Sequence, residues 1–296
     1  MWNRRIVLVL FIMLLAWAYQ NTCPPPPKIC GSPGGPPITA PRIKLRDGRH
    51  LAYKEHGVPK QVAKYKIIYF HGFSSCRHNE IIVTKVSPEL VQELGVYVVT
   101  FDRPGYGESD PDPNRTVKSL ALDIEELADQ LGLGSRFYVI GLSMGGQVVW
   151  SCLKYIPRRL AGAALIAPVV NYWWPGFPAN LSAAAYYKQP LADQWAPHEV
   201  KQQGEFESFH RDLIVGFGSW EFDPMDLENP FQNNEGSVHL WHGDDDRLVP
   251  VTLQRYIASK LPWIHYHEIP GSGHFFINLD GMSETILNAL LVGEKK

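Results

Sequence analysis

The chain has 296 residues, 45% of them hydrophobic, which is enough for one large domain with a sizeable buried core and an inserted element. Its 28 Lys and Arg residues nearly balance 30 Asp and Glu residues, so no excess of charge indicates a nucleic acid, an anionic surface or a polyanionic substrate. The charge balance therefore excludes nucleic-acid binding as the leading function.

The N-terminal segment begins with Arg4 and Arg5, followed by a continuous apolar run over residues 6–19. This run is short for a membrane span, which needs about 20 apolar residues. With the small-x-small triplet 16–18, it predicts a secretory signal peptide cleaved after Ala18. Aromatic residues at both ends favour an uncleaved signal anchor in a thin bilayer equally well. Residues 1–20 are therefore a signal peptide or a signal anchor, with membrane attachment through residues 6–19 in the second case.

Both readings place the following domain in the lumen of the secretory pathway, either anchored to the membrane or secreted. There, the sequons that begin at Asn114 and Asn180 would accept glycans. The alternative is a cytosolic chain with a buried N-terminal helix.

Residues 21–41 are rich in Pro and Gly and cannot continue a helix or a strand, so we expect a stalk or a strap over the surface. Cys23 and Cys30 bracket four prolines, and in an oxidising lumen they would close a small loop. Two solvent-facing thiols are the alternative. The spacings of the four cysteines match no zinc site, so no metal is expected. Cys152 is predicted to be a small buried hydrophobic residue.

Residues 42–296 are predicted to form the folded domain. It starts with a hairpin around the Asp47-Gly48 turn, and short apolar runs then alternate with helical stretches. This order is typical of an α/β fold, a mostly parallel central sheet with helices on both faces. The strands are expected at 66–70, 96–101, 137–140, 163–166, 238–241 and 264–269, and the helices at 88–94, 118–131 and 147–155. The alternation fails once, which predicts an inserted helical cap at about 171–236.

The segment Gly141-Leu142-Ser143-Met144-Gly145 is a Gly-x-Ser-x-Gly sequence that follows a predicted strand and opens a helix. A nucleophile on so sharp a turn needs strained backbone at Ser143 and small flanking residues. The start of the next helix favours the oxyanion that develops when a carbonyl is attacked. Ser143 is therefore the candidate nucleophile.

A serine nucleophile needs a base and a carboxylate that orients the base. His274 lies in a Gly-rich loop after the last predicted strand, and three adjacent aspartates, 244–246, follow the strand before it. We select Asp246, with Asp244 and Asp245 on a solvated turn. The order Ser, Asp, His along the chain completes a candidate catalytic triad of Ser143, Asp246 and His274.

The backbone amides of Phe73 and Met144 are the candidate oxyanion-hole donors. Phe73 belongs to the loop that His71 and Gly72 begin, and we expect the His71 side chain to be a satisfied core histidine. Asp102 and Arg103 are expected to brace loops rather than react.

Four motifs in order, the His-Gly loop, the Asp-Arg-Pro-Gly turn 102–105, the Ser143 elbow and the final Gly-x-Gly-His, together resemble the α/β-hydrolase superfamily over nearly the whole chain from residue 42. The Pro-rich stalk and the segment 41–48 resemble plant members in particular. In the superfamily pattern Gly-x-x-Asp-x-x-Val-Pro, only Asp246 occupies the acid position. The chain departs from epoxide hydrolases, whose elbow has Asp where this chain has Ser143, and it lacks the triple-glycine loop of the hormone-sensitive-lipase group.

The resemblance implies a serine hydrolase that cleaves a carboxylic ester of a small hydrophobic molecule through an acyl-enzyme, without a cofactor. Four cap aromatics are candidates to line the substrate pocket, with core packing as the alternative: Trp173, Trp174, Tyr186 and Tyr187. An acyltransferase or a lyase would use the same triad. The alternative from another class is a ligand receptor of the same fold with very slow turnover.

Overall fold

A computed structural model of the chain describes residues 2–186, 202–233 and 235–293. Its centre is a sheet of eight strands among the described residues, in the order β1-β2-β4-β3-β5-β6-β7-β8. The first two strands are antiparallel to their neighbours, and the other neighbouring pairs are parallel. The strands are β1 (Arg42–Lys44), β2 (His50–Gly57), β3 (Tyr65–Phe70), β4 (Val96–Phe101), β5 (Phe137–Leu142), β6 (Leu160–Ile166), β7 (Val238–Gly243) and β8 (Ile264–Ile269).

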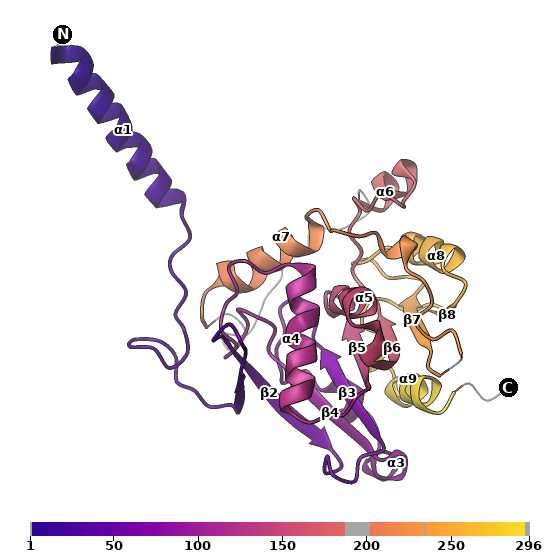
Figure 1. The fold of residues 1–296 in the computed structure, drawn as a ribbon. Coiled ribbons are helices and arrows are strands. Elements are labelled where there is room, and N and C mark those ends of the chain that lie inside the picture. The colour runs from indigo at the N-terminus through magenta and orange to yellow at the C-terminus, as the bar shows by residue number, and fades with distance from the viewer. Residues whose placement is uncertain (1, 187–201, 234, 294–296) are drawn as a thin grey trace.

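The central strands are buried on both faces, because successive side chains along a strand enter different cores. In β3, Ile67 and Tyr69 pack in one hydrophobic cluster, whereas Ile68 and Phe70 pack in the other. Helices α4 (Val117–Gln130), α5 (Gly145–Tyr155) and α8 (Val251–Lys260) cover one face. The other face is covered by α2 (Ile81–Thr84), α3 (Pro88–Leu94) and α9 (Met282–Leu291) (Figure 1). The α/β architecture expected from the sequence is confirmed.

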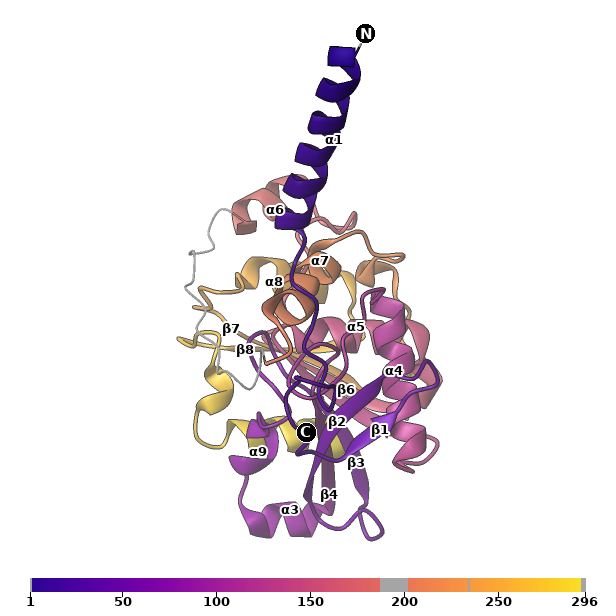
Figure 2. The same cartoon turned by 90° about the vertical axis from the view of Figure 1, so that its left-hand side faces the viewer.

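The segment between β6 and β7 contains two α-helices in its described part, α6 (Ala179–Tyr186) and α7 (Arg211–Phe217). The π-helix η3 (Phe206–His210) precedes α7, and the 3-10 helix η4 (Pro224–Asp226) follows it. We call this segment the cap. It lies at the end of the sheet where the parallel strands have their carboxyl ends (Figures 1 and 2).

The N-terminal run forms one helix, α1 (Trp2–Thr22), that projects away from the sheet (Figure 2). None of the residues from Arg4 to Thr22 is buried, so the reading as a buried N-terminal helix is wrong. The strap after α1 is held to the domain by backbone and side-chain hydrogen bonds. Lys28 N–H donates to the Gln203 carbonyl at 2.9 Å, and Thr39 and Ala40 donate to the Glu108 carboxylate.

The two cysteines of this region match the second expectation only in part, because Cys23 is solvent-exposed but Cys30 is not. Cys23 and Cys30 are both free thiols, so no disulfide closes the proline loop. Cys30 is buried, and its Sγ lies 3.8 Å from the Gly107 carbonyl, so it is not solvent-facing. Cys152 is buried in the core, as expected.

Candidate active site

Ser143 sits on a sharp turn between β5 and α5, with a φ of 54° that a residue with a side chain rarely adopts. Neighbouring backbone approaches this turn so closely that only glycine fits beside it. A Cβ on Gly141 would lie 2.3 Å from the Gly145 carbonyl oxygen, and one on Gly145 would lie 2.3 Å from that of Phe70. The strained elbow expected from the Gly-x-Ser-x-Gly sequence is therefore present.

Three side chains from the carboxyl ends of three strands form one chain of hydrogen bonds. Ser143 Oγ lies 3.0 Å from His274 Nε2, and His274 Nδ1 lies 2.7 Å from Asp246 Oδ2. They follow β5, β8 and β7, and parallel strands bring these ends to one edge of the sheet. This arrangement lets the imidazole take a proton from the hydroxyl while the carboxylate fixes the ring.

The Asp246 carboxylate is held from several sides. Its Oδ1 accepts hydrogen bonds from the Leu248 and Val249 amides at 2.9 and 2.8 Å, and His242 Nε2 lies 3.2 Å from its Oδ2. Burial by itself raises the pKa of this carboxyl, but the hydrogen bonds from His242 and His274 outweigh burial and hold the pKa well below its usual range. Asp246 is thus kept ionised.

The two neighbouring aspartates have other surroundings. Asp245 is exposed and lies 3.3 Å from Arg247. Asp244 is half-buried and accepts a 3.4 Å hydrogen bond from the Ser272 amide, so it is less solvated than expected. The structure describes all three aspartates, and of these Asp246 alone is hydrogen-bonded to His274.

The two predicted oxyanion donors belong to the elbow itself, at Met144, and to the loop that begins at Gly72. A Cβ on Gly72 would lie 3.1 Å from Ser143 Cβ, which places the loop carrying Phe73 directly against the elbow. Within the described part of the chain, neither the Phe73 nor the Met144 amide donates to a protein group. Both amides are therefore available to an oxyanion.

His71 is the satisfied buried histidine that was expected. Its Nε2 accepts from the Arg103 amide at 3.1 Å, so its Nδ1 carries the proton and donates to the Gly72 carbonyl at 2.8 Å. Burial, assisted by the nearby Arg103 charge, lowers the pKa of His71 to about 3. The imidazole is therefore neutral near pH 7.

The predicted pocket aromatics divide into three groups. Trp174 is buried in the core, whereas Trp173 and Tyr186 are exposed with ring centroids 5.8 Å apart. Tyr187 lies outside the described residues. Trp173 and Trp174 also border a hollow of about 280 Å³, to which Phe217 contributes.

Phe217 was not predicted from the sequence, yet it connects that hollow to the nucleophile region. It packs against an apolar cluster at the elbow made of Met144, Val169, Val249, Phe73 and Leu248. His242 was also missed, because a histidine at the end of a buried strand carries no sequence signal of its contact with Asp246.

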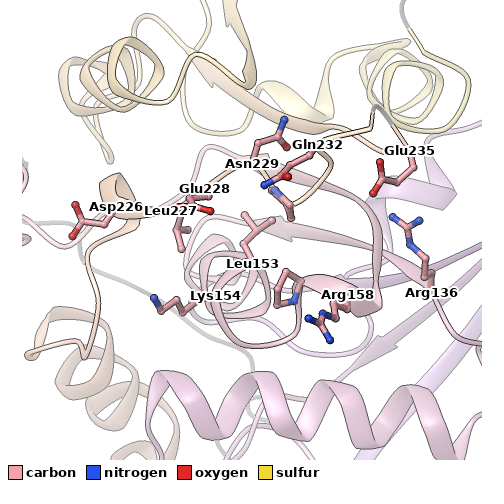
Figure 3. A pocket seen from close by; sticks show the side chains of 12 residues that line it. Arg136, Leu153, Lys154, Arg158, Asp226, Leu227, Glu228, Asn229, Gln232 and Glu235 are labelled. Atoms are coloured by element: carbon pink, nitrogen blue, oxygen red, sulfur yellow. The ribbon is translucent and has the colours of Figure 1, made fainter.

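A larger hollow of about 580 Å³ lies elsewhere, at the C-terminal end of α5 (Figure 3). Its charged lining combines the cations Arg136, Lys154 and Arg158 with the acidic residues Asp226, Glu228 and Glu235, and no triad residue lines it. In the described part of the chain, no group of three His, Cys, Asp or Glu side chains is arranged to hold a metal.

Comparison with known proteins gives relatives that share this architecture. The chain is 29% identical over 208 residues to a putative carbamate hydrolase RutD from Caulobacter sp. strain K31, covering 60% of this chain and 74% of that protein. The solved enol-lactonase from Burkholderia xenovorans LB400 matches with a TM-score of 0.63 at 18% identity, over 86% of this chain and all of the other. The solved esterase from Exiguobacterium antarcticum matches with a TM-score of 0.62 at 16% identity, over 84% and 98%.

The model of the alpha/beta hydrolase family matches residues 67–286, which include the elbow, the Asp246 loop and the His274 loop. The match spans most of the sheet and every residue of the hydrogen-bonded chain. The chain therefore belongs to the alpha/beta hydrolase family.

Proposed function

We propose that this hydrolase cleaves a carboxylic ester of a small hydrophobic molecule through an acyl-enzyme on Ser143. The observation that carries the proposal is the continuous hydrogen-bonded chain from Ser143 Oγ through His274 to Asp246. His274 Nε2 takes the hydroxyl proton as Oγ attacks the carbonyl carbon, and the resulting oxyanion faces the Phe73 and Met144 amides. The alcohol leaves with the proton from His274. Water activated by His274 then releases the acid and restores Ser143.

The surroundings of the nucleophile favour a hydrophobic substrate. Met144, next to Ser143, belongs to a cluster of apolar side chains that includes Phe217, and Phe217 also lines the hollow bordered by Trp173. An apolar wall with few polar groups selects substrates by shape and desolvation. Several proteins of similar fold are described as esterases or a lactonase, and a sequence relative as a putative carbamate hydrolase, so an aryl carbamate belongs in the substrate panel.

We also propose that α1 anchors the protein in a membrane of the secretory pathway. The helix is 21 residues long, and its apolar stretch, residues 6–19, covers about 21 Å, which suits a thin bilayer with Arg4 and Arg5 at one interface. From the end of α1 at Thr22, six residue steps reach Lys28, whose amide donates a hydrogen bond to the carbonyl of Gln203 in the cap. An extended chain of that length covers only about 20 Å, so the cap stays near the membrane surface. A lipophilic ester would then have a short path to the site.

The test is turnover of p-nitrophenyl esters of graded chain length, and of an aryl carbamate, by the purified chain. We expect turnover above about one per second for a preferred ester, as for ordinary enzymes, and none for Ser143→Ala. Stoichiometric ligand binding with far slower turnover would instead favour the receptor reading. If an added alcohol receives the acyl group, so that a new ester forms instead of the free acid, the result would favour an acyltransferase. Cleavage without an acyl-enzyme would favour a lyase.

The proposed likeness to plant members of the superfamily rests on the Pro-rich stalk and on the segment 41–48 alone.

A further inference from the structure

The peptide unit between Gly72 and Phe73 is held by its carbonyl oxygen. This oxygen accepts two hydrogen bonds, one from His71 Nδ1 at 2.8 Å and one from Arg103 Nη2 at 3.0 Å. The C=O and N–H of a trans peptide lie in one plane and point in opposite directions. Donors that fix the Gly72 carbonyl therefore also fix the direction of the Phe73 N–H.

The two donors differ in charge. The His71 imidazole is neutral, because its other nitrogen accepts from the Arg103 amide. The Arg103 guanidinium is cationic, and a charged donor makes a stronger hydrogen bond than a neutral one. In a buried site, a hydrogen bond to one end of a peptide polarises the other end, so Arg103 makes the Phe73 N–H a better donor.

Arg103 is in turn fixed by the cap. Asp212, on α7, accepts from Arg103 Nη1 at 2.7 Å and lies 2.6 Å from its Nη2. The same carboxylate accepts from Arg115 at 2.8 Å and from the Tyr106 hydroxyl at 2.6 Å. All four side chains are buried. Two guanidinium groups share one carboxylate, so the cluster keeps an excess of positive charge beside the Gly72 carbonyl.

We propose that Arg103 is a positioning residue for the reaction: it orients and polarises the Gly72–Phe73 peptide, and Asp212 makes that orientation depend on the position of α7. This inference rests on the proposed ester hydrolysis. Arg103 lies behind the peptide, on its carbonyl side, and acts on substrate only through the Phe73 amide. The negative charge on the substrate oxygen is largest in the transition state. Loss of Arg103 therefore lowers kcat and leaves KM nearly unchanged.

The test compares Arg103→Gln and Arg103→Lys with Tyr106→Phe in the full-length chain. Tyr106→Phe is the matched control, because it removes one hydrogen bond to Asp212 and leaves the Gly72 carbonyl untouched. We expect Arg103→Gln to lower kcat by about 10- to 100-fold, less than the roughly 100- to 1,000-fold cost of removing an oxyanion-hole donor outright, and to change KM less than two-fold. Arg103→Lys keeps the charge and should recover part of this loss. Tyr106→Phe should lower the melting temperature and leave kcat near wild type.

A second readout does not depend on ester turnover. A fluorophosphonate reacts when Ser143 Oγ attacks phosphorus and fluoride leaves, while its phosphoryl oxygen takes the place of the oxyanion. Arg103→Gln should lower the second-order rate of this labelling by about the same factor as kcat. If wild type is labelled but hydrolyses no ester, the proposed function fails while the inference is still decided by the labelling rates. If the rates of both Arg103 variants match that of Tyr106→Phe, Arg103 only braces the cap and the inference is overturned. Should Arg103→Gln fail to fold, the charge-conserving Arg103→Lys is compared with Tyr106→Phe instead. A slower labelling rate in Arg103→Lys supports the inference, and equal rates overturn it.

Discussion

Asp246 Oδ2 lies between two imidazoles, 2.7 Å from His274 Nδ1 and 3.2 Å from His242 Nε2. His242 Nε2 also lies 2.8 Å from the Val249 carbonyl, which requires this nitrogen to carry a proton. Since His242 is the penultimate residue of β7, a fully buried strand, it offers the carboxylate a second, rigid donor. Contacts other than the one to His274 therefore already orient the carboxylate for its hydrogen bond to His274.

The first prediction concerns this second histidine. His242→Leu removes the donor, so we expect turnover to fall about ten-fold and the free energy of unfolding to fall by about 1–3 kcal/mol, the cost of leaving a buried polar partner unsatisfied. His242→Gln keeps an N–H group and should lose less of both. Steady-state kinetics and urea unfolding of the two variants measure this. Equal turnover in His242→Leu and wild type would show that Asp246 is oriented without His242.

The second prediction separates the three adjacent aspartates. Asp246→Asn should leave the fold intact and lower turnover by up to about four orders of magnitude, because the amide no longer fixes the imidazole tautomer or stabilises the imidazolium. Asp245→Asn and Asp244→Asn should change turnover little, since neither side chain contacts His274. The steady-state turnover of the three single variants on one ester decides the matter. A large loss at Asp245 with Asp246→Asn near wild type would refute the assignment.

The third prediction concerns stability below neutral pH. Burial holds the pKa of His71 and of His239 at about 3, far below the value of about 6.5 for an unfolded histidine. Between these values the unfolded chain binds more protons than the folded chain. The stability due to the neutral rings is therefore complete above about pH 6.5 and is lost as the pH falls toward 3. Each ring contributes a slope of up to about 1.4 kcal/mol per pH unit.

Urea unfolding at several values between pH 7 and 4.5 measures that slope. His239→Gln should give a flatter dependence than wild type, by up to the contribution of one ring, whatever its stability at pH 7. His239 contacts Ser237 and His267 on the sheet and is not hydrogen-bonded to a triad residue among the described residues. Identical slopes for the two proteins would mean that His239 takes up a proton without unfolding.

The fourth prediction concerns topology. If α1 directs the domain into the lumen, the protein from a eukaryotic cell should shift in mass on deglycosidase treatment, because Asn114 and Asn180 are both exposed. Carbonate extraction and N-terminal sequencing then separate an anchor from a cleaved signal. Recovery in the cytosolic fraction with neither sequon occupied would contradict the lumenal assignment.

The sequence by itself determined the local features that set the fold. Continuous apolar runs predicted strands buried on both faces, such as β4 over residues 96–101. The Gly-x-Ser-x-Gly spacing predicted the strained turn at Ser143, because both the strain and the close packing arise within a few residues. Position at the ends of successive strands was enough to select His274 and the loop of three aspartates, since parallel strands end at the same edge of the sheet, and the superfamily pattern then selected Asp246 within that loop.

Only the tertiary structure decided which distant side chains meet. Nothing near Asp212 in the sequence indicates that it holds Arg103, which lies more than a hundred positions earlier. The same is true of Phe217 beside Met144 and of Cys30, which the strap buries against the Gly107 carbonyl. These contacts form when the cap and the strap pack onto the sheet. Their geometry depends on how whole elements fit together, which local propensity and spacing do not specify.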